Sequence, residues 1–243
     1  MHLDALRDGH SSPARRLGVV WQALTGAIDE GPVSVLDCGG GSGAFAVPLA
    51  ALGHHVTVVD ISADALATLA RRAAERGVPA AGGAVVPVQG DVENLGDAVG
   101  QRQFDVVLAH GILGVVDDAP SAFTGIVAAT RPGGVLSVVV NNPVAAVLAR
   151  ALGGDIPAAL EEFRSLDTAV RPGPDAVRAL AHDHGLLVEQ VHGVGVFAEI
   201  VPGRAVDSPD AREALADLEA EAATRSPFTE IASRVHVLAR RPS

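Results

Sequence analysis

Residues 33–45 read VSVLDCGGGSGAF and place a carboxylate two residues before a run of glycines. Glycines in a turn after a strand let the backbone approach a ligand closely. Gly39, Gly41 and Ala44 match G-x-G-x-x-G/A, the pattern of turns that bind the pyrophosphate of a dinucleotide. Asp37 opposes that interpretation, because a carboxylate at the end of the strand repels a phosphate at the helix N-terminus. The same carboxylate favours a cationic ligand that carries no phosphate.

Two further acids follow later strand-like runs. Asp60 closes HVTVVD, and Asp91 lies in VPVQGDVENL. Asp60 alone suits the ribose of a dinucleotide equally well, so it does not decide between the two kinds of ligand. Both acids also have an ordinary structural alternative. Asp60 could cap the next helix, although Ser62 already offers a cap, and Asp91 could be a turn residue.

The segments that must position these acids alternate between apolar strands and helices. Strands are predicted at 33–37, 55–59, 84–88, 104–109 and 134–140, with helices at 14–29, 43–52, 63–76, 93–100 and 119–130. Beyond Asn142, the pattern predicts two short helices in 144–163, a helix within 171–185, a strand at 186–201, a helix at 208–224 and a strand at 233–239. Nearly continuous apolar strands separated by helices are typical of a parallel sheet covered on both faces.

We therefore expect an α/β fold with a doubly wound, mostly parallel, seven-stranded sheet. The two late strands are expected to form an antiparallel hairpin at its edge. No linker or repeat interrupts the pattern, so residues 1–243 are expected to form a single domain.

Composition excludes several classes of function. The chain has 243 residues and a formal net charge of −11, which disfavours a large nucleic-acid footprint. Cys38 is the one cysteine, and no Cys/His spacing indicates zinc, so we expect neither a disulfide nor a metal site. No apolar run is long enough for a signal peptide or a membrane span. We expect a cytoplasmic protein.

The ordered motifs resemble those of class I S-adenosylmethionine-dependent methyltransferases. VLDCGGGSGAF resembles their first motif, and RPGGVLSV at 131–138 resembles their turn into strand five. The resemblance implies that Asp60 grips the ribose hydroxyls, that Asp91 lies beside the adenine amine, and that Val92 packs against the ring. It implies S-adenosylmethionine as cofactor, a molecule with an ammonium, a sulfonium and no phosphate. The cofactor-binding residues are then expected to be Arg16, Asp37, Gly39, Gly41, Gly43, Asp60, Ile61, Asp91, Val92 and His110.

Over most of its length the chain is similar to the bacterial branch that holds the tRNA carboxymethoxyuridine methyltransferases. It departs from that branch at three places: Gly114-Val115 replaces a Glu-Trp pair, Asn141-Asn142 replaces Tyr-Asn, and Gly195 replaces an arginine. Each change removes an aromatic or cationic group that could stack on a base or hold a phosphate. We therefore expect a small-molecule acid or hydroxyl as methyl acceptor, with the tRNA nucleoside as the alternative.

Methyl transfer from a sulfonium is an in-line displacement, so the protein's main task is to align acceptor and methyl group. A carboxylate acceptor needs no base, whereas a hydroxyl or amine could use one. His110 is the candidate for a catalytic base, and a cofactor contact is its alternative role. Arg16 is the candidate for the methionine carboxylate. Asn141, Asn142, Arg164 and Arg171 are candidates for acceptor binding, and residues 1–22 and 143–172 for a substrate-selecting lid.

Two other classes remain as alternatives. An NAD(P)-dependent oxidoreductase is disfavoured because the chain has no tyrosine and no lysine, and so no Tyr-x-x-x-Lys pair. A cofactor-binding module without catalytic activity would keep the same pocket residues.

Overall fold

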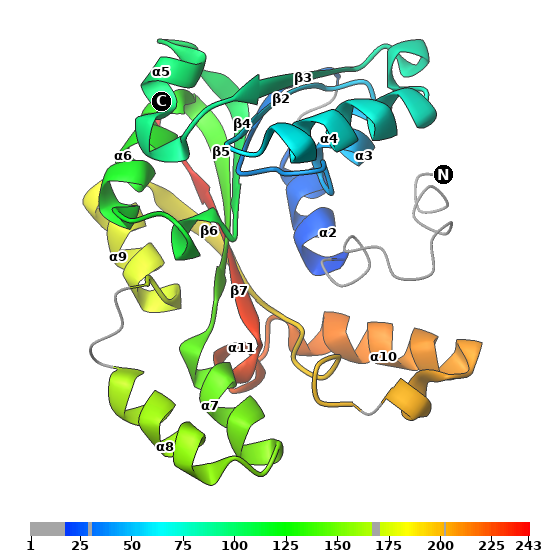
Figure 1. Ribbon diagram of the computed structural model, residues 1–243, viewed down its shortest axis with the longest axis vertical. Coiled ribbons are helices and arrows are strands. Elements are labelled where there is room, and N and C mark those ends of the chain that lie inside the picture. Colours follow the sequence, from blue (N-terminus) through cyan, green and yellow to red (C-terminus); the bar gives the residue numbers. More distant parts are fainter. Residues whose placement is uncertain (1–17, 29–30, 167–170, 202) are drawn as a thin grey trace.

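The computed structural model describes residues 18–28, 31–166, 171–201 and 203–243 (Figure 1). Seven strands form one sheet in the order β3-β2-β1-β4-β5-β7-β6. The strands are β1 (Ser34–Cys38), β2 (His55–Asp60), β3 (Ala84–Gln89), β4 (Phe104–His110), β5 (Thr130–Asn141), β6 (Leu187–Val194) and β7 (Arg234–Arg240). The first five strands run parallel, as their nearly continuous apolar sequences predict.

Helices cover both faces of this sheet. The helices are α2 (Gly18–Ala27), α3 (Ala46–Ala51), α4 (Ala63–Glu75), α5 (Leu95–Val99), α6 (Ala119–Ala129), α7 (Pro143–Leu152), α8 (Ile156–Ser165), α9 (Pro174–Asp183), α10 (Pro209–Ala222) and α11 (Phe228–Ile231). One core packs α2, α3 and α4 against the sheet, and a second core packs α5, α6 and α9 against the opposite face. The expected doubly wound architecture is therefore confirmed.

The two late strands pair antiparallel, as expected, but the second of them is not at the edge. β7 inserts between β5 and β6 and runs antiparallel to both. The strand predicted at 186–201 is also shorter than expected. It ends at Val194 because Gly195 takes a φ of +70° and the N–H groups of Val196, Phe197 and Ala198 turn to the Glu219 carboxylate, at 2.9, 2.7 and 2.6 Å.

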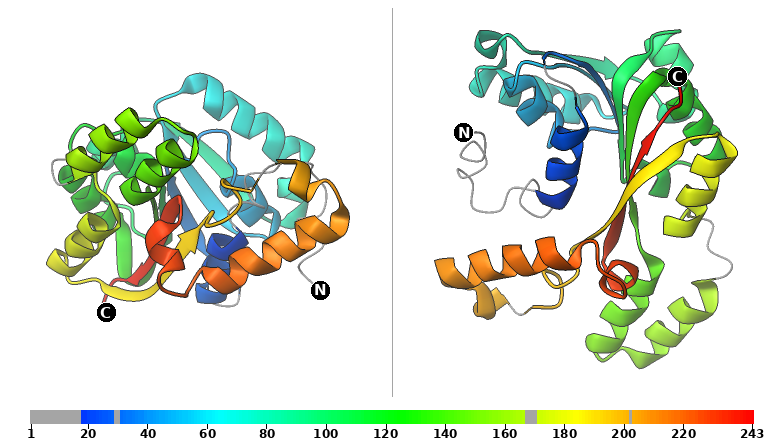
Figure 2. Two further views of the ribbon diagram at one scale, coloured as in Figure 1. Left: turned by 90° about the horizontal axis from the view of Figure 1, so that it is seen from below. Right: turned by 180° about the vertical axis from the view of Figure 1, so that it is seen from behind.

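The two helices that directly follow β5 stand apart from the body of the sheet. α7 and α8 form a helical hairpin, broken at Gly153-Gly154 as the sequence predicts, and α10 lies at the same end of the molecule (Figures 1 and 2). In α7 no side chain is buried, and in α8 only Ala159 is. Among the described residues, no helix is long and apolar enough to cross a membrane.

Candidate active site

The candidate residues gather at the carboxyl ends of four neighbouring strands. Asp37 lies near the end of β1, Asp60 and His110 end β2 and β4, and Asp91 follows β3. Since β3, β2, β1 and β4 are adjacent and parallel, their carboxyl ends lie along one edge of the sheet. This edge is where ligands bind in open α/β sheets. Sequence positions that lie far apart are thereby brought to one site.

Asp37 is a buried carboxylate without a partner. It is 3% exposed, and no donor in the described part of the chain forms a hydrogen bond or ion pair with it. Burial and, to a smaller extent, the nearby Asp60 carboxylate together raise the pKa of Asp37 to about 7. A cationic group bound here would restore its ionised form. The site therefore fits a ligand with an ammonium group and disfavours a phosphate.

The glycine turn is shaped by close contacts that a side chain would prevent. Gly39, Gly41 and Gly43 take φ values of +70°, +53° and +80°. A Cβ at Gly39 would lie 2.7 Å from Cδ1 of Ile112, and one at Gly40 would collide with the Asp37 carboxylate. A Cβ at Gly41, by contrast, would have only an Asp60 oxygen nearby, at 3.8 Å. The turn thus packs against the protein on one side and opens toward Asp60 on the other.

Asp60 connects the second strand to that turn. Its Oδ2 accepts a hydrogen bond from the Gly41 N–H at 2.9 Å, and its Oδ1 accepts one from the Ser62 N–H at 2.8 Å. Ser62 itself caps α4 by accepting a hydrogen bond from the Ala65 N–H. Each carboxylate oxygen keeps a second lone pair, so Asp60 can accept hydrogen bonds from a ligand while it holds the turn.

The three residues expected near the adenine ring differ in exposure. Asp91 is exposed, and its Oδ1 accepts a hydrogen bond from the Glu93 N–H at 3.0 Å, which caps the short 3₁₀ helix Val92–Asn94. Val92 is 3% exposed and packs in the core beneath α6. Ile61 is 70% exposed at the end of β2. The roles of these three residues toward an adenine ring remain predictions.

His110 is a neutral imidazole in an apolar setting. Its ring packs edge-on to Phe45, with ring centroids 4.5 Å apart, and its Nε2 lies 2.7 Å from the Ser137 hydroxyl. Burial lowers the pKa of His110 to about 3, so the ring carries no charge at neutral pH. Nδ1 is buried and has no hydrogen-bond partner in the described part of the chain.

The expected acceptor residues are spread over several segments. Asn142 is buried, and its side-chain N–H groups donate to the carbonyls of Glu230 and Ala232 at 2.8 and 2.9 Å. These two hydrogen bonds therefore fix the position of the chain that leads from α11 to β7. Asn141, Arg164 and Arg171 are exposed, on β5, on α8 and before α9. Arg16 lies outside the described residues.

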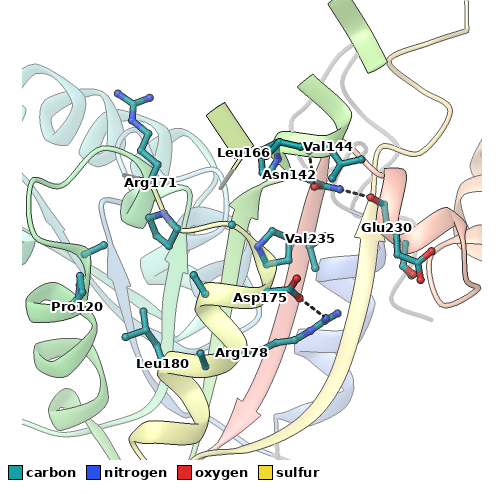
Figure 3. Close-up of a pocket in the computed structure, with 18 of the residues that line it drawn as sticks. Pro120, Asn142, Val144, Leu166, Arg171, Asp175, Arg178, Leu180, Glu230 and Val235 are labelled. Atoms are coloured by element: carbon teal, nitrogen blue, oxygen red, sulfur yellow. Dashed lines mark hydrogen bonds and ion pairs between the residues drawn. The ribbon is translucent and has the colours of Figure 1, made fainter. Parts of the chain in front are cut away.

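A cavity of about 750 Å³ opens between α7, α9 and α11 (Figure 3). Asn142 and Arg171 line it, together with Val144, Leu180 and Val235. Figure 3 shows Arg178 beside Asp175, an ion pair of 3.0 Å. None of the expected cofactor residues lines this cavity. It adjoins the carboxyl end of β5, where the lid segment begins.

The sequence did not single out three residues that the structure connects to His110. Ser137 on β5, His236 on β7 and His192 on β6 continue from the His110 ring as a line of hydrogen bonds. The alternation of these residues with apolar neighbours indicated that they are buried. Nothing in the sequence predicted how the three strands pair. Among the described residues, no group of three His, Cys, Asp or Glu side chains is arranged to hold a metal ion.

Comparison with known proteins identifies the class of this site. Residues 35–134 match a family described as a methyltransferase domain. The tRNA 5-carboxymethoxyuridine methyltransferase of Escherichia coli O157:H7 is 28% identical over 235 residues, covering 93% of this chain and 88% of that protein. The ubiquinone biosynthesis O-methyltransferase of Paramagnetospirillum magneticum is 31% identical over 169 residues, covering 67% of this chain and 62% of that protein.

A solved structure shares the fold. The N-methyltransferase NodS of Bradyrhizobium japonicum, in complex with S-adenosylhomocysteine, superposes with a TM-score of 0.58 over 96% of this chain and 90% of that chain, at 14% identity. The buried, unpaired Asp37 beside an open glycine turn agrees with a ligand of that kind.

Proposed function

This chain belongs to the class I S-adenosylmethionine-dependent methyltransferases, and we propose that it methylates an oxygen, or alternatively a nitrogen, of a small-molecule acid or hydroxyl compound. S-adenosylmethionine supplies the electrophilic methyl group when it is bound. The protein's residues bind, orient and shield the reactants. Asp37 accepts the ammonium group, Asp60 the ribose hydroxyls, and Asp91 the adenine amine, with the neutral His110 at the end of β4.

The observation that carries the choice of acceptor is the balance of charge near the end of β5. The cavity is lined by two arginines, Arg171 and Arg178, and by three acids, Asp175, Asp183 and Glu230. Arg178 is already paired with Asp175. With a formal charge of −11 on the whole chain, this lining supports a small acceptor over a polyanion such as tRNA.

The hairpin of α7 and α8 is proposed as the lid, together with the N-terminal segment 1–22, of which residues 1–17 lie outside the described residues. Its exposed apolar side chains include Leu152, Ile156 and Phe163, which are 70%, 60% and 62% exposed. A lid that closes with apolar side chains excludes water and favours an acceptor with an apolar body. This hairpin follows directly from β5, so it starts at the edge of the sheet that carries the site.

A modified wobble nucleoside of tRNA is the second candidate acceptor. The similarity over 93% of the chain to a tRNA 5-carboxymethoxyuridine methyltransferase favours it. The residue at position 195 weighs against it. Gly195 has a φ of +70°, and a Cβ there would lie 2.6 Å from the Ser233 hydroxyl. An arginine at this position would require a different local backbone. Replacing Gly195 by arginine would therefore not by itself restore a side chain that could hold a phosphate.

The test supplies the protein with S-adenosylmethionine labelled in the methyl group. The acceptors come from a cell extract separated into tRNA and small molecules, and Asp60→Ala serves as the control protein. We expect label in the small-molecule fraction. Mild base then releases methanol from an ester but not from an ether or amine. Label confined to tRNA would establish the alternative acceptor. Binding of S-adenosylhomocysteine without any transfer would instead indicate a non-catalytic cofactor-binding module.

A further inference from the structure

Four polar side chains form one hydrogen-bonded line across four adjacent strands. His110 Nε2 lies 2.7 Å from the Ser137 hydroxyl, which lies 2.9 Å from Nε2 of His236. Nδ1 of His236 lies 3.2 Å from Nδ1 of His192, and the planes of the two rings are nearly parallel, at 13°. Ser137 and His236 are fully buried, and His192 is 8% exposed. The line faces the core that α2 and α3 cover, among Val139, Val194 and Leu238.

The hydrogens in this line cannot be arranged independently. Each bond needs one donor, the serine has one hydrogen, and a neutral histidine has one N–H. Burial lowers the pKa of His110, His192 and His236, so all three rings are neutral. Two arrangements satisfy every bond. Either His110 donates from Nε2 and all bonds point toward His192, or His192 donates from Nδ1 and all bonds point toward His110.

The free end of the line decides between the two arrangements. If the bonds point toward His110, its buried Nδ1 carries a hydrogen that no described residue accepts. If they point toward His192, Nδ1 of His110 is a bare lone pair instead. A buried N–H without an acceptor is rarer in proteins than an acceptor without a donor. At the other end, the partly exposed His192 can satisfy its Nε2–H with water. The arrangement in which all bonds point toward His192 is therefore the favoured one.

We infer that Ser137, His236 and His192 are positioning residues that hold His110 in the Nε2–H form, so that its bare Nδ1 accepts a hydrogen bond from the methyl acceptor. This inference rests on the proposed methyl transfer and narrows it. A bare nitrogen pairs with an acceptor that carries a hydrogen and repels the lone pairs of a carboxylate. Among the proposed oxygen acceptors, a hydroxyl compound therefore fits this nitrogen and a carboxylate does not. His110 Nδ1 orients the acceptor oxygen through its hydrogen and directs the oxygen lone pair toward the methyl group. As the oxygen–methyl bond forms and the sulfur–methyl bond breaks, the hydroxyl proton passes to Nδ1, and the line carries a proton away through Ser137, His236 and His192 to water.

The test begins with the protein alone, because the arrangement of hydrogens exists before any substrate binds. Two-bond ¹H–¹⁵N spectra of protein labelled at histidine distinguish a bare ring nitrogen from an N–H nitrogen, and His110→Asn assigns the signals of His110. We expect a bare Nδ1 and a protonated Nε2 in the wild type, unchanged between about pH 6 and 8. A protonated Nδ1 would overturn the inference. This readout does not depend on methyl transfer, so it separates failure of the inference from failure of the proposed function.

Variants then test the line itself. Ser137→Ala removes the link and should let both neutral forms of His110 appear in the spectrum. His236→Gln keeps an amide near the serine and should retain the single form. His54→Gln is the control, since His54 is also buried and hydrogen-bonded, but at the start of β2 on the opposite edge of the sheet. With a hydroxyl acceptor, kcat of Ser137→Ala should fall by about tenfold or more while affinity for S-adenosylhomocysteine stays within about twofold. A single unchanged form of His110 in Ser137→Ala, with unchanged kcat, would contradict the positioning role.

Discussion

The Asp60 carboxylate accepts a hydrogen bond from the Gly41 N–H at 2.9 Å, which ties the end of the second strand to the glycine turn after the first. One side chain thus holds the turn in place and faces the ligand that the turn admits. The same arrangement leaves Asp37 buried beneath the turn with no partner in the described chain.

Replacing Asp60 by alanine should weaken binding of S-adenosylhomocysteine by about 1–3 kcal/mol, because ribose hydroxyls in the site then lose their acceptors. Calorimetry measures this loss directly. Asp64→Ala is a matched control, since Asp64 is an exposed carboxylate one turn further on, in the first turn of α4. Equal affinities for wild type and Asp60→Ala would show that the ribose contact is assigned to the wrong residue.

Replacing Gly41 by alanine should abolish cofactor binding with only a small loss of stability. A Cβ at Gly41 meets no protein atom closer than 3.8 Å, so it enters the space that opens toward the ligand. The positive φ adds a backbone strain of about 1 kcal/mol. Gly77→Ala carries the same kind of strain, with a φ of +70° and no atom within 4 Å, at a distance from the site. Unfolding in urea and calorimetry should therefore show similar stabilities for the two variants and different affinities. Full binding by Gly41→Ala would place the ligand elsewhere.

Replacing Asp37 by asparagine should change how stability depends on pH in the absence of cofactor. The pKa of Asp37 is raised from 3.8 to about 7 in the folded protein. Between those values the folded state binds more protons at this group than the unfolded state does. This group therefore lowers the free energy of unfolding as pH rises from about 4 to about 7, by on the order of 4 kcal/mol.

The measurement compares urea unfolding of the wild type and Asp37→Asn at pH 5 and pH 8. Relative to the variant, the wild type should lose stability at the higher pH, and Asp97→Asn, at an exposed carboxylate on α5, should show no such difference. The same Asp37→Asn variant should bind S-adenosylhomocysteine more weakly. A difference between wild type and variant that does not depend on pH would mean that Asp37 is ionised in the free protein.

Replacing both Leu152 and Phe163 by serine should raise KM for the acceptor by several-fold and leave cofactor affinity unchanged. These side chains are 70% and 62% exposed on the α7–α8 hairpin, so the change should alter stability little. Their loss removes apolar surface with which the proposed lid covers the acceptor. Leu187→Ser, at a 59% exposed leucine on the edge strand β6, is the control. Identical KM values in all three proteins would remove the hairpin from the proposed lid.

Much of the fold could be predicted from the sequence because local pattern and global fold agree. The glycine turn, Asp60 and the apolar strands lie in consecutive strand–turn–helix units, and each unit specifies its own contribution to the same edge of the sheet. The structure places Asp37, Asp60, Asp91 and His110 along that edge. Their roles toward the cofactor's separate groups stay predictions.

The line from His110 to His192 could not be predicted in the same way. It depends on the insertion of β7 between β5 and β6, and on a register that sets His192 opposite His236. Such pairings join residues far apart in the sequence, and a shift of one residue would turn each side chain to the other face. The partners of Asn142 have the same origin, since its amide is fixed by carbonyls of the chain before β7.

We propose that Asp37 makes the glycine turn a site for a cationic, phosphate-free cofactor. Calorimetric titration of the wild-type protein with S-adenosylhomocysteine and, separately, with NAD tests this role of Asp37. We expect saturable binding of S-adenosylhomocysteine, weakened in Asp37→Asn, and no binding of NAD to either protein. Tight binding of NAD with none of S-adenosylhomocysteine would contradict the claim.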